Sequence, residues 1–190
     1  MTDSREESKA SSTERPGGAP VLFTIGHSTR SIEDFLALLK AHGMRRVLDV
    51  RTVPRSHRNP QFGIEVLPQS LAAAGIDYVH MPSLGGLRHA ERDSTNMGWR
   101  NASFRGYADY MQTAEFEQAL DELMALAREQ PTAIMCAEAV PWRCHRSLIG
   151  DALTVRGVAV KHIMSLNTAQ PHRMTPFARV EGTRIIYPAS

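Results

Sequence analysis

Short apolar runs alternate with amphipathic segments along most of this chain, and no other feature of the sequence constrains the fold as strongly. The runs have the length of strands, and the segments between them show the spacing of helices that cover one face of a sheet. Strand and helix in alternation build βαβ units, whose strands are parallel and buried on both faces. We therefore predict a three-layer α/β sandwich with a mostly parallel sheet of about five strands and helices on both faces.

The bounds of these elements follow from local signals. Strands are expected at 21–26, 46–51, 76–80, 132–136 and 158–163, with one more near the C-terminus at 184–187. Helices are expected after the capping residues Ser31 and Thr113, and over 67–74 and 146–155. The segment 82–106 has no periodic pattern, so we expect an irregular loop of the kind that is either functional or disordered.

Composition indicates a globular chain. The 190 residues include 22 Lys or Arg and 20 Asp or Glu, and the net charge of +2 excludes a protein that coats polyanions. Residues 1–20 are polar, so we expect a disordered tail, no signal peptide and a single α/β domain over 21–190. Two cysteines are too few for a disulfide scaffold, and no apolar run is long enough to cross a membrane. We expect a cytoplasmic protein with reduced thiols and no membrane partner.

Polar side chains follow the predicted parallel strands at the points where these strands end. They are His27, Ser28, Asp49, Arg51, His80, Cys136, Glu138 and His162. Because the carboxyl ends of parallel strands meet at one edge of the sheet, where ligands bind, we expect these side chains to share one site. For each of them taken alone, a structural hydrogen bond to a loop is the simpler explanation.

The segment 135–146 carries the densest chemistry of the chain. It leads from a strand end into a helix start, where unpaired amides and the helix dipole favour anions and lower the pKa of a thiol. Positive charge is added there by Arg143, His145 and Arg146. We therefore predict that Cys136 is a nucleophile or a ligand, with His145 and Glu138 as further catalytic groups. Glu138 opposes the shift of the thiol pKa, so the sequence leaves its direction open.

Other interpretations of this segment compete. Six residues separate Cys136 from Arg143, one more than in the phosphate loop of cysteine phosphatases, which argues against that mechanism. Cys136, Glu138, Cys144 and His145 are metal-ligand types, but seven residues lie between the cysteines rather than the roughly two to four usual at zinc sites. The spacing is therefore weak evidence for a metal site, and we assign no residue as a metal ligand. Packing of both thiols as small apolar side chains is the simplest alternative.

Arg51 follows Asp49 by two residues, and alternation in a strand puts both side chains on the same face. We predict that Arg51 either pairs with Asp49 or Glu138 or is directed by them towards a ligand. A lysine at this position distinguishes the two cases, because only a bidentate contact requires the planar guanidinium.

Several short motifs together carry a resemblance to a known family. They are TIGHS at 24–28, DVR at 49–51 with Pro54 and Ser56, GIDY at 75–78, LGGLR at 84–88, FRGYADYM at 104–111, MCAE at 135–138 with Pro141, CHR at 144–146, and HI at 162–163. In this combination, over roughly 21–165, the chain resembles the domain of unknown function 488 family of small, mostly bacterial proteins. The resemblance implies an α/β domain with a shared rim built from these segments, and it implies no particular activity.

Three functions of different classes fit these residues. The first is an enzyme of hydrolase or transferase type that acts on a phosphate-bearing substrate, a nucleotide or a nucleic acid, with Cys136 as nucleophile and His145 as general base. Its substrate-binding residues would be His27, Ser28, Asp49, Arg51, His80, Arg88, Arg143 and Arg146.

The second function is a nucleic-acid-binding module without catalysis, in which arginine-rich loops at 45–58 and 88–105 contact phosphates. A pI near 8.7 is low for such a module. The third is a metal-binding or redox-sensing protein that uses Cys136 and Cys144. The sequence identifies neither a cofactor nor an oligomeric state. The partner expected from it is an anionic small molecule or a nucleic acid.

Overall fold

The computed structural model describes residues 21–189, so the tail predicted at 1–20 lies outside the described residues. The main sheet has six strands in the order β3–β2–β4–β1–β5–β6. Their bounds are β1 Val21–Gly26, β2 Arg46–Asp49, β3 Asp77–His80, β4 Thr132–Cys136, β5 Ala159–Ser165 and β6 Thr168–Pro171. The strands from β3 to β5 are parallel to their neighbours, and β6 is antiparallel at the edge. The mostly parallel α/β sheet predicted from the sequence is confirmed.

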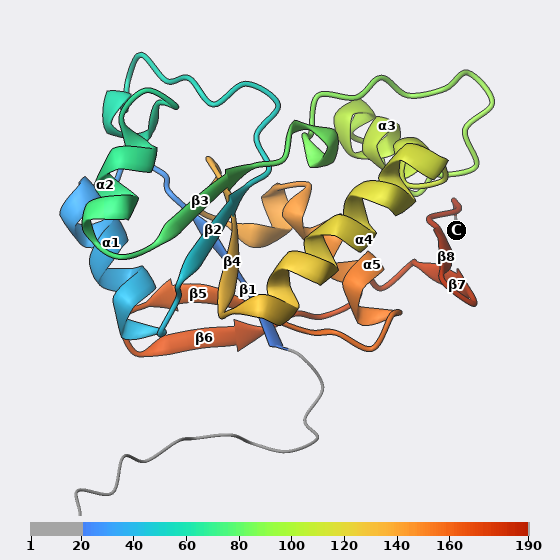
Figure 1. Ribbon diagram of the computed structural model, residues 1–190. Coiled ribbons are helices and arrows are strands. Elements are labelled where there is room, and N and C mark those ends of the chain that lie inside the picture. Colours follow the sequence, from blue (N-terminus) through green and yellow to red (C-terminus); the bar gives the residue numbers. More distant parts are fainter. Residues whose placement is uncertain (1–20, 190) are drawn as a thin grey trace, which may run out of the picture.

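Helices cover both faces of this sheet (Figure 1). The α-helices are α1 Ile32–Ala41, α2 Leu67–Ala73, α3 Ala102–Tyr110, α4 Ala114–Glu129 and α5 Arg146–Thr154. Short 3-10 turns lie at η1 Pro60–Phe62, η2 Pro82–Leu84 and η3 Pro141–Arg143, and a two-stranded sheet pairs β7 Arg179–Glu181 with β8 Arg184–Ile186. Among the described residues, no helix combines the length and apolar character required to cross a membrane.

The predicted helix caps are present. The Ser31 hydroxyl accepts the Asp34 amide at 3.0 Å before α1, and the Thr113 hydroxyl accepts the Phe116 amide at 3.2 Å before α4. Helix α3 lies partly in the segment predicted to be irregular, where the Asn101 side chain caps its first turn. A glycine within this helix, Gly106, hides its pattern in the sequence.

Side chains that alternate along the strands divide the core into two apolar clusters. Val47, Ala133 and Met135 face α1 and α2, whereas Leu48 and Ile134 face α4 and α5. This division carries on to the strand ends. Both faces of the sheet end at its carboxyl edge. Side chains from the two sides of the sheet can therefore reach the same region at the ends of the strands.

Candidate functional site

A cavity of about 640 Å³ lies at the carboxyl ends of β1, β2 and β4. Its lining includes the predicted site residues His27, Ser28, Arg51, Cys136, Glu138, Arg143 and His145. The predicted residues Asp49, His80, Arg88 and Arg146 are not part of its lining. The structure thus brings most of the predicted set to one place, and these four residues, together with the predicted strand-end residue His162, take positions outside the lining that are described below.

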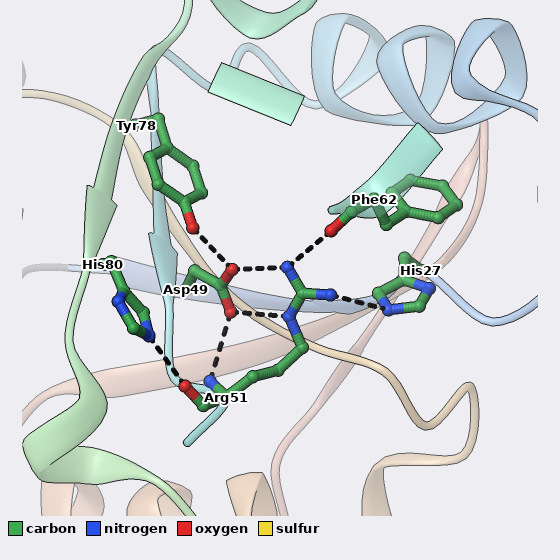
Figure 2. A network of polar contacts seen from close by, with 6 residues as sticks. All are labelled: His27, Asp49, Arg51, Phe62, Tyr78 and His80. Carbon is green, nitrogen blue, oxygen red and sulfur yellow. Dashed lines mark hydrogen bonds and ion pairs between the residues drawn. The ribbon is translucent and has the colours of Figure 1, made fainter. Parts of the chain in front are cut away.

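Asp49 and Arg51 form a buried ion pair beneath the cavity (Figure 2). Arg51 Nε donates to Asp49 Oδ1 at 2.8 Å and Arg51 Nη2 donates to Asp49 Oδ2 at 2.5 Å, which is the bidentate geometry. Arg51 Nη2 also donates to the Phe62 carbonyl at 2.8 Å, and the Tyr78 hydroxyl donates to Asp49 Oδ2 at 2.7 Å. Asp49 is fully buried. The pairing of Arg51 with Asp49, one of the predicted alternatives, is present. Asp49 lies outside the lining of the cavity and orients Arg51, which is part of it.

His27 is a neutral neighbour of this pair. Its Nδ1 donates to the Ser28 carbonyl at 2.8 Å, so Nε2 is left to accept Arg51 Nη1 at 3.3 Å (Figure 2). The ring stacks on Phe62 with the centroids 4.2 Å apart. Burial lowers the pKa of His27 to about 4, and the positive charge of Arg51 also lowers it. His27 therefore offers no charge to a ligand at neutral pH.

His80 and Arg88 support loops rather than line the cavity. His80 Nε2 donates to the Arg51 carbonyl at 2.8 Å, which is the ordinary role of a histidine at a strand end (Figure 2). Arg88 lies over the Tyr110 ring, with its central guanidinium carbon 3.5 Å from the ring centroid. Its Nε and Nη2 donate to backbone carbonyls of Gly85 and Ser83. The substrate-binding role that the sequence suggested for these two residues has no geometric support.

Arg146 is a buried cation without a carboxylate partner. It is 1% exposed and forms no ion pair with an Asp or Glu of the described residues. It donates from Nη2 to the Glu138 carbonyl, from Nη1 to Thr24 Oγ1 at 3.3 Å and from Nε to Cys144 Sγ at 3.3 Å. A buried charge is stable only when it is paired. Arg146 is not part of the cavity lining, and Cys144 Sγ is the one group among its described hydrogen-bond partners that can carry a negative charge.

The backbone around Arg146 is held by a close approach at Gly26. A Cβ atom at this position would lie only 1.9 Å from the Glu138 carbonyl oxygen, which is the oxygen that accepts Arg146 Nη2. Backbone bonds from His27 and Ser28 to the carbonyls of Cys136 and Ala137 continue this contact between β1 and the end of β4. Glycine is thus required at 26 for the loop to reach Arg146.

The two thiols lie together at the cavity. Cys136 Sγ, Cys144 Sγ and a ring nitrogen of His145 all lie within 4.8 Å of one another. The pKa of Cys144 lies well below its ordinary value, because it accepts a hydrogen bond from Cys136, and because His145 and Arg146 stabilise its charge. The same hydrogen bond, together with burial, raises the pKa of Cys136. The sequence left the direction of the Cys136 pKa open, and the contacts of Arg146 and His145 favour Cys144 as the sulfur that carries the negative charge.

His145 is oriented for a role at this sulfur. Its Nε2 donates to the Val50 carbonyl at 3.2 Å, so Nδ1 faces Cys144 Sγ at 3.7 Å and can hold the proton that Cys144 loses. Gly86 packs so closely against the ring that a Cβ atom at this position would lie only 2.6 Å from Nδ1. Cysteine and histidine in such a contact have the chemistry of a nucleophile and its general base.

The same three groups also have the chemistry of metal ligands. Two thiolates and an imidazole would suit a divalent cation such as zinc. The buried guanidinium of Arg146 already places a positive charge beside Cys144. A Cys144 thiolate balanced by this guanidinium does not require a metal ion. The arrangement accordingly fits a free thiolate at least as well as a metal.

Three arginines supply positive charge to the cavity without being used by the fold. Arg55, Arg58 and Arg143 line it and are exposed, and their guanidinium groups make no hydrogen bond or ion pair with the described residues. Glu138 is the one acidic residue in the lining that the structure describes, and its Oε1 accepts the Val140 amide at 3.1 Å. The cavity is thus suited to an anion.

Sequence reasoning gave no catalytic role to Cys144, and it included Arg55 and Arg58 only in the loop 45–58 of the nucleic-acid-binding alternative. The two arginines belong to the loop after β2. Their presence in this loop can be seen in the sequence, but the direction of their side chains depends on the path of the loop. A signal for Cys144 was present in its neighbours His145 and Arg146. The burial of Arg146 determines which of the two thiols has a cation beside it. This burial depends on the tertiary structure and leaves no signal in the sequence.

Comparison with known proteins adds one finding. Neither the curated proteins nor the solved structures contain a match to this chain. The family described as "Domain of unknown function DUF488" matches residues 31–153, well over half of the 190 residues. The match includes Asp49, Arg51, both cysteines and His145. The chain belongs to the DUF488 family, as the motifs of its sequence implied.

Proposed function

We propose that this protein is a cytosolic enzyme of hydrolase or transferase type in which Cys144 is the nucleophile and the arginines of the cavity bind a phosphate-bearing substrate. One observation carries the proposal. The buried Arg146 has the Cys144 sulfur as its anionic partner, and this sulfur lies at a cavity with three arginines that have no acceptor among the described residues. A stabilised thiolate beside a positively charged surface favours nucleophilic chemistry on an anion.

The chemistry follows from the positions of the groups. Cys144 Sγ attacks phosphorus, a sulfur–phosphorus bond forms, and the bond from phosphorus to the leaving oxygen breaks. His145 Nδ1, which holds the proton lost by the thiol, returns it to the leaving oxygen. Water or an acceptor hydroxyl then attacks the phosphocysteine and restores the thiolate. Arg143 and the loop arginines balance the charge of the phosphoryl oxygens.

The first test is the reactivity of the two thiols. Alkylation of the folded protein by iodoacetamide should occur at Cys144 with a midpoint clearly below the ~8.5 of a free thiol. Cys144→Ser should remove this phase and Cys136→Ser should keep it. Inorganic phosphate should slow the alkylation, and Arg143→Gln should weaken the protection. Arg179→Gln, an exposed arginine outside the cavity, is the matched control.

The second test measures catalysis with p-nitrophenyl phosphate. Release of p-nitrophenolate should require Cys144 and should survive Arg179→Gln. Alkylation without phosphate protection, or release that persists in Cys144→Ser, would refute the proposal. Thiols that react only after chelation would indicate a bound metal instead. Steeply salt-dependent binding of an oligonucleotide without turnover would indicate the non-catalytic alternative.

A further inference from the structure

The only two cysteines of the chain are neighbours at one wall of the cavity. Cys136 closes β4, and Cys144 precedes α5, so two elements of the fold hold the thiols in place. Their sulfur atoms lie within 4.8 Å of each other. The nucleophilic step above uses Cys144 alone and leaves the second thiol without a chemical role.

A thiolate next to a thiol is the arrangement required for two-electron redox chemistry. The thiolate is the group that attacks an oxidant, and the neighbouring thiol then closes a disulfide before further oxidation can occur. Cys144 is the attacking sulfur, because Arg146 and His145 stabilise its charge. Cys136 is the resolving sulfur, because it keeps its proton until the second step.

We propose that Cys136 and Cys144 form a dithiol that reduces hydroperoxides and closes to a reversible intramolecular disulfide. The inference rests on the assignment of the thiolate in the proposed function, and it requires neither the phosphate substrate nor the loop arginines. Closure of the disulfide removes the Cys144 nucleophile, so oxidation also switches off the chemistry proposed above.

The two steps balance in atoms and electrons. Cys144 Sγ attacks the terminal oxygen of the hydroperoxide, the O–O bond breaks, and the departing alkoxide takes the proton held on His145 Nδ1 and leaves as an alcohol. Cys144 is then a sulfenic acid. Cys136 Sγ attacks this sulfur, the S–S bond forms, and the hydroxide leaves as water with the Cys136 proton. One hydroperoxide is reduced by two electrons and the two thiols are oxidised by two.

Burial indicates a small oxidant. Cys144 is 5% exposed and Cys136 is 9% exposed, so the sulfur atoms can be reached only through the cavity. A hydroperoxide needs to present only one oxygen to Cys144, whereas exchange with a protein disulfide requires a sulfur on a bulky partner to reach the same point. The geometry therefore favours hydroperoxides over protein disulfides as the oxidant.

The same burial predicts that the disulfide is easily reduced. In the oxidised protein, Cys144 carries no charge, and Arg146 loses its anionic partner in a place where no carboxylate of the described residues replaces it. Stabilisation of the thiolate thus stabilises the reduced form relative to the disulfide. We expect that reduced glutathione alone restores both thiols.

The experiment uses the full chain, reduced and treated with a chelator, and hydrogen peroxide as the probe. Intact mass should fall by two hydrogens without dimer formation, and both thiols should become inaccessible to iodoacetamide after unfolding. Cys136→Ser should instead accumulate a sulfenic acid at Cys144 that dimedone traps. At pH 7 a thiol of pKa ~8.5 is about 3% thiolate, so oxidation of the wild type should be at least about tenfold faster than that of Cys144→Ser.

Several results would overturn the inference. They are a wild-type protein that forms only sulfinic acid or intermolecular disulfides, oxidation at a rate equal to that of Cys144→Ser, and a disulfide that glutathione does not reduce. The outcome is separate from that of the proposed function. A disulfide without phosphate protection of Cys144 refutes only the proposed function, and phosphate protection without a disulfide refutes only the hydroperoxide chemistry.

Discussion

Replacing Arg51 by lysine isolates what the planar guanidinium contributes to the Asp49 network. The guanidinium uses three nitrogens at once: two on the Asp49 carboxylate, one of which also donates to the Phe62 carbonyl, and a third on His27 Nε2. A lysine ammonium is a single nitrogen at the end of a flexible stem and cannot reach these acceptors together. The substitution keeps the positive charge but not the bidentate geometry.

The expected cost follows from the hydrogen bonds that a lysine cannot make. Hydrogen bonds to charged groups are worth about 1.5–3 kcal/mol each, and at least one of the two on Asp49 disappears, so Arg51→Lys should cost about 2–4 kcal/mol. Arg51→Met, which leaves the buried carboxylate unpaired, should cost about 3–5 kcal/mol. For a chain of this size, a destabilisation of about 3 kcal/mol lowers the melting temperature by roughly 6–12 °C.

Urea unfolding followed by circular dichroism measures these values, with an unchanged slope as evidence that the unfolded state is the same. Arg46→Lys is the matched control, because Arg46 begins β2, the strand that Arg51 follows, but pairs with the exposed carboxylates of Asp77 and Glu129. Surface pairs of this kind contribute about 0–1 kcal/mol. If Arg51→Lys costs no more than Arg46→Lys, the bidentate contact is irrelevant to stability and Arg51 serves only as a compensating charge.

Two further predictions concern histidines of the site. Burial lowers the pKa of His27 from 6.5 to about 4, so the unfolded chain binds the proton first and stability falls as the pH drops from 6.5 towards 4. His27→Gln should therefore abolish about 2–3 kcal/mol of the loss between pH 7 and 4.5 in urea unfolding; an unchanged loss contradicts the assignment. Gly86→Ala should displace the His145 ring and raise the alkylation midpoint of Cys144, whereas Gly63→Ala, with its nearest contact at 3.2 Å, should leave the midpoint unchanged. An unaltered midpoint in Gly86→Ala would mean that His145 does not stabilise the thiolate.

The central strands could be predicted from the sequence because burial on both faces imposes continuous apolar runs. The predicted bounds of β1 and β4 agree with the structure, and β4 is buried along its whole length. Strand β6 was not predicted, because it pairs with β5 at the edge of the sheet and its residues are mostly exposed. Such an edge strand forms because its backbone hydrogen bonds to a neighbouring strand. These hydrogen bonds leave no apolar pattern in the sequence.

The candidate site could likewise be predicted from the sequence only where local patterns determine it. The pairing of Asp49 with Arg51 was one of the alternatives that their two-residue spacing predicted, and this spacing is a local property, although β2 ends at Asp49 and Arg51 lies beyond it. The assignment of charge between Cys136 and Cys144 depends on the burial of Arg146 and on its distance from one sulfur. Both arise when α5 packs beside β1, and no spacing in the sequence reports them.

A row of buried hydrogen bonds ties the Cys144 thiolate to the interior of the protein. It runs through Arg146, Thr24, His162, His172 and Asp151. Asp151 can only accept, so His172 Nε2 donates to it at 2.8 Å and, with both rings neutral, His162 Nε2 donates to His172 Nδ1 at 3.0 Å. His162 Nδ1 then accepts the Thr24 hydroxyl at 2.7 Å, which leaves the Thr24 oxygen to accept Arg146.

This row has one proton arrangement when both rings are neutral, and burial favours a neutral His162 because it lowers the pKa of that ring to about 4. Arg146 is therefore oriented by groups of β5 and α5 that lie away from the cavity. The charge that stabilises the Cys144 thiolate is fixed by the core, whereas the arginines that would meet a ligand, Arg55 and Arg58, lie on an exposed loop. If the proposed function holds, substitutions in this loop should change which anion binds without changing the Cys144 nucleophile.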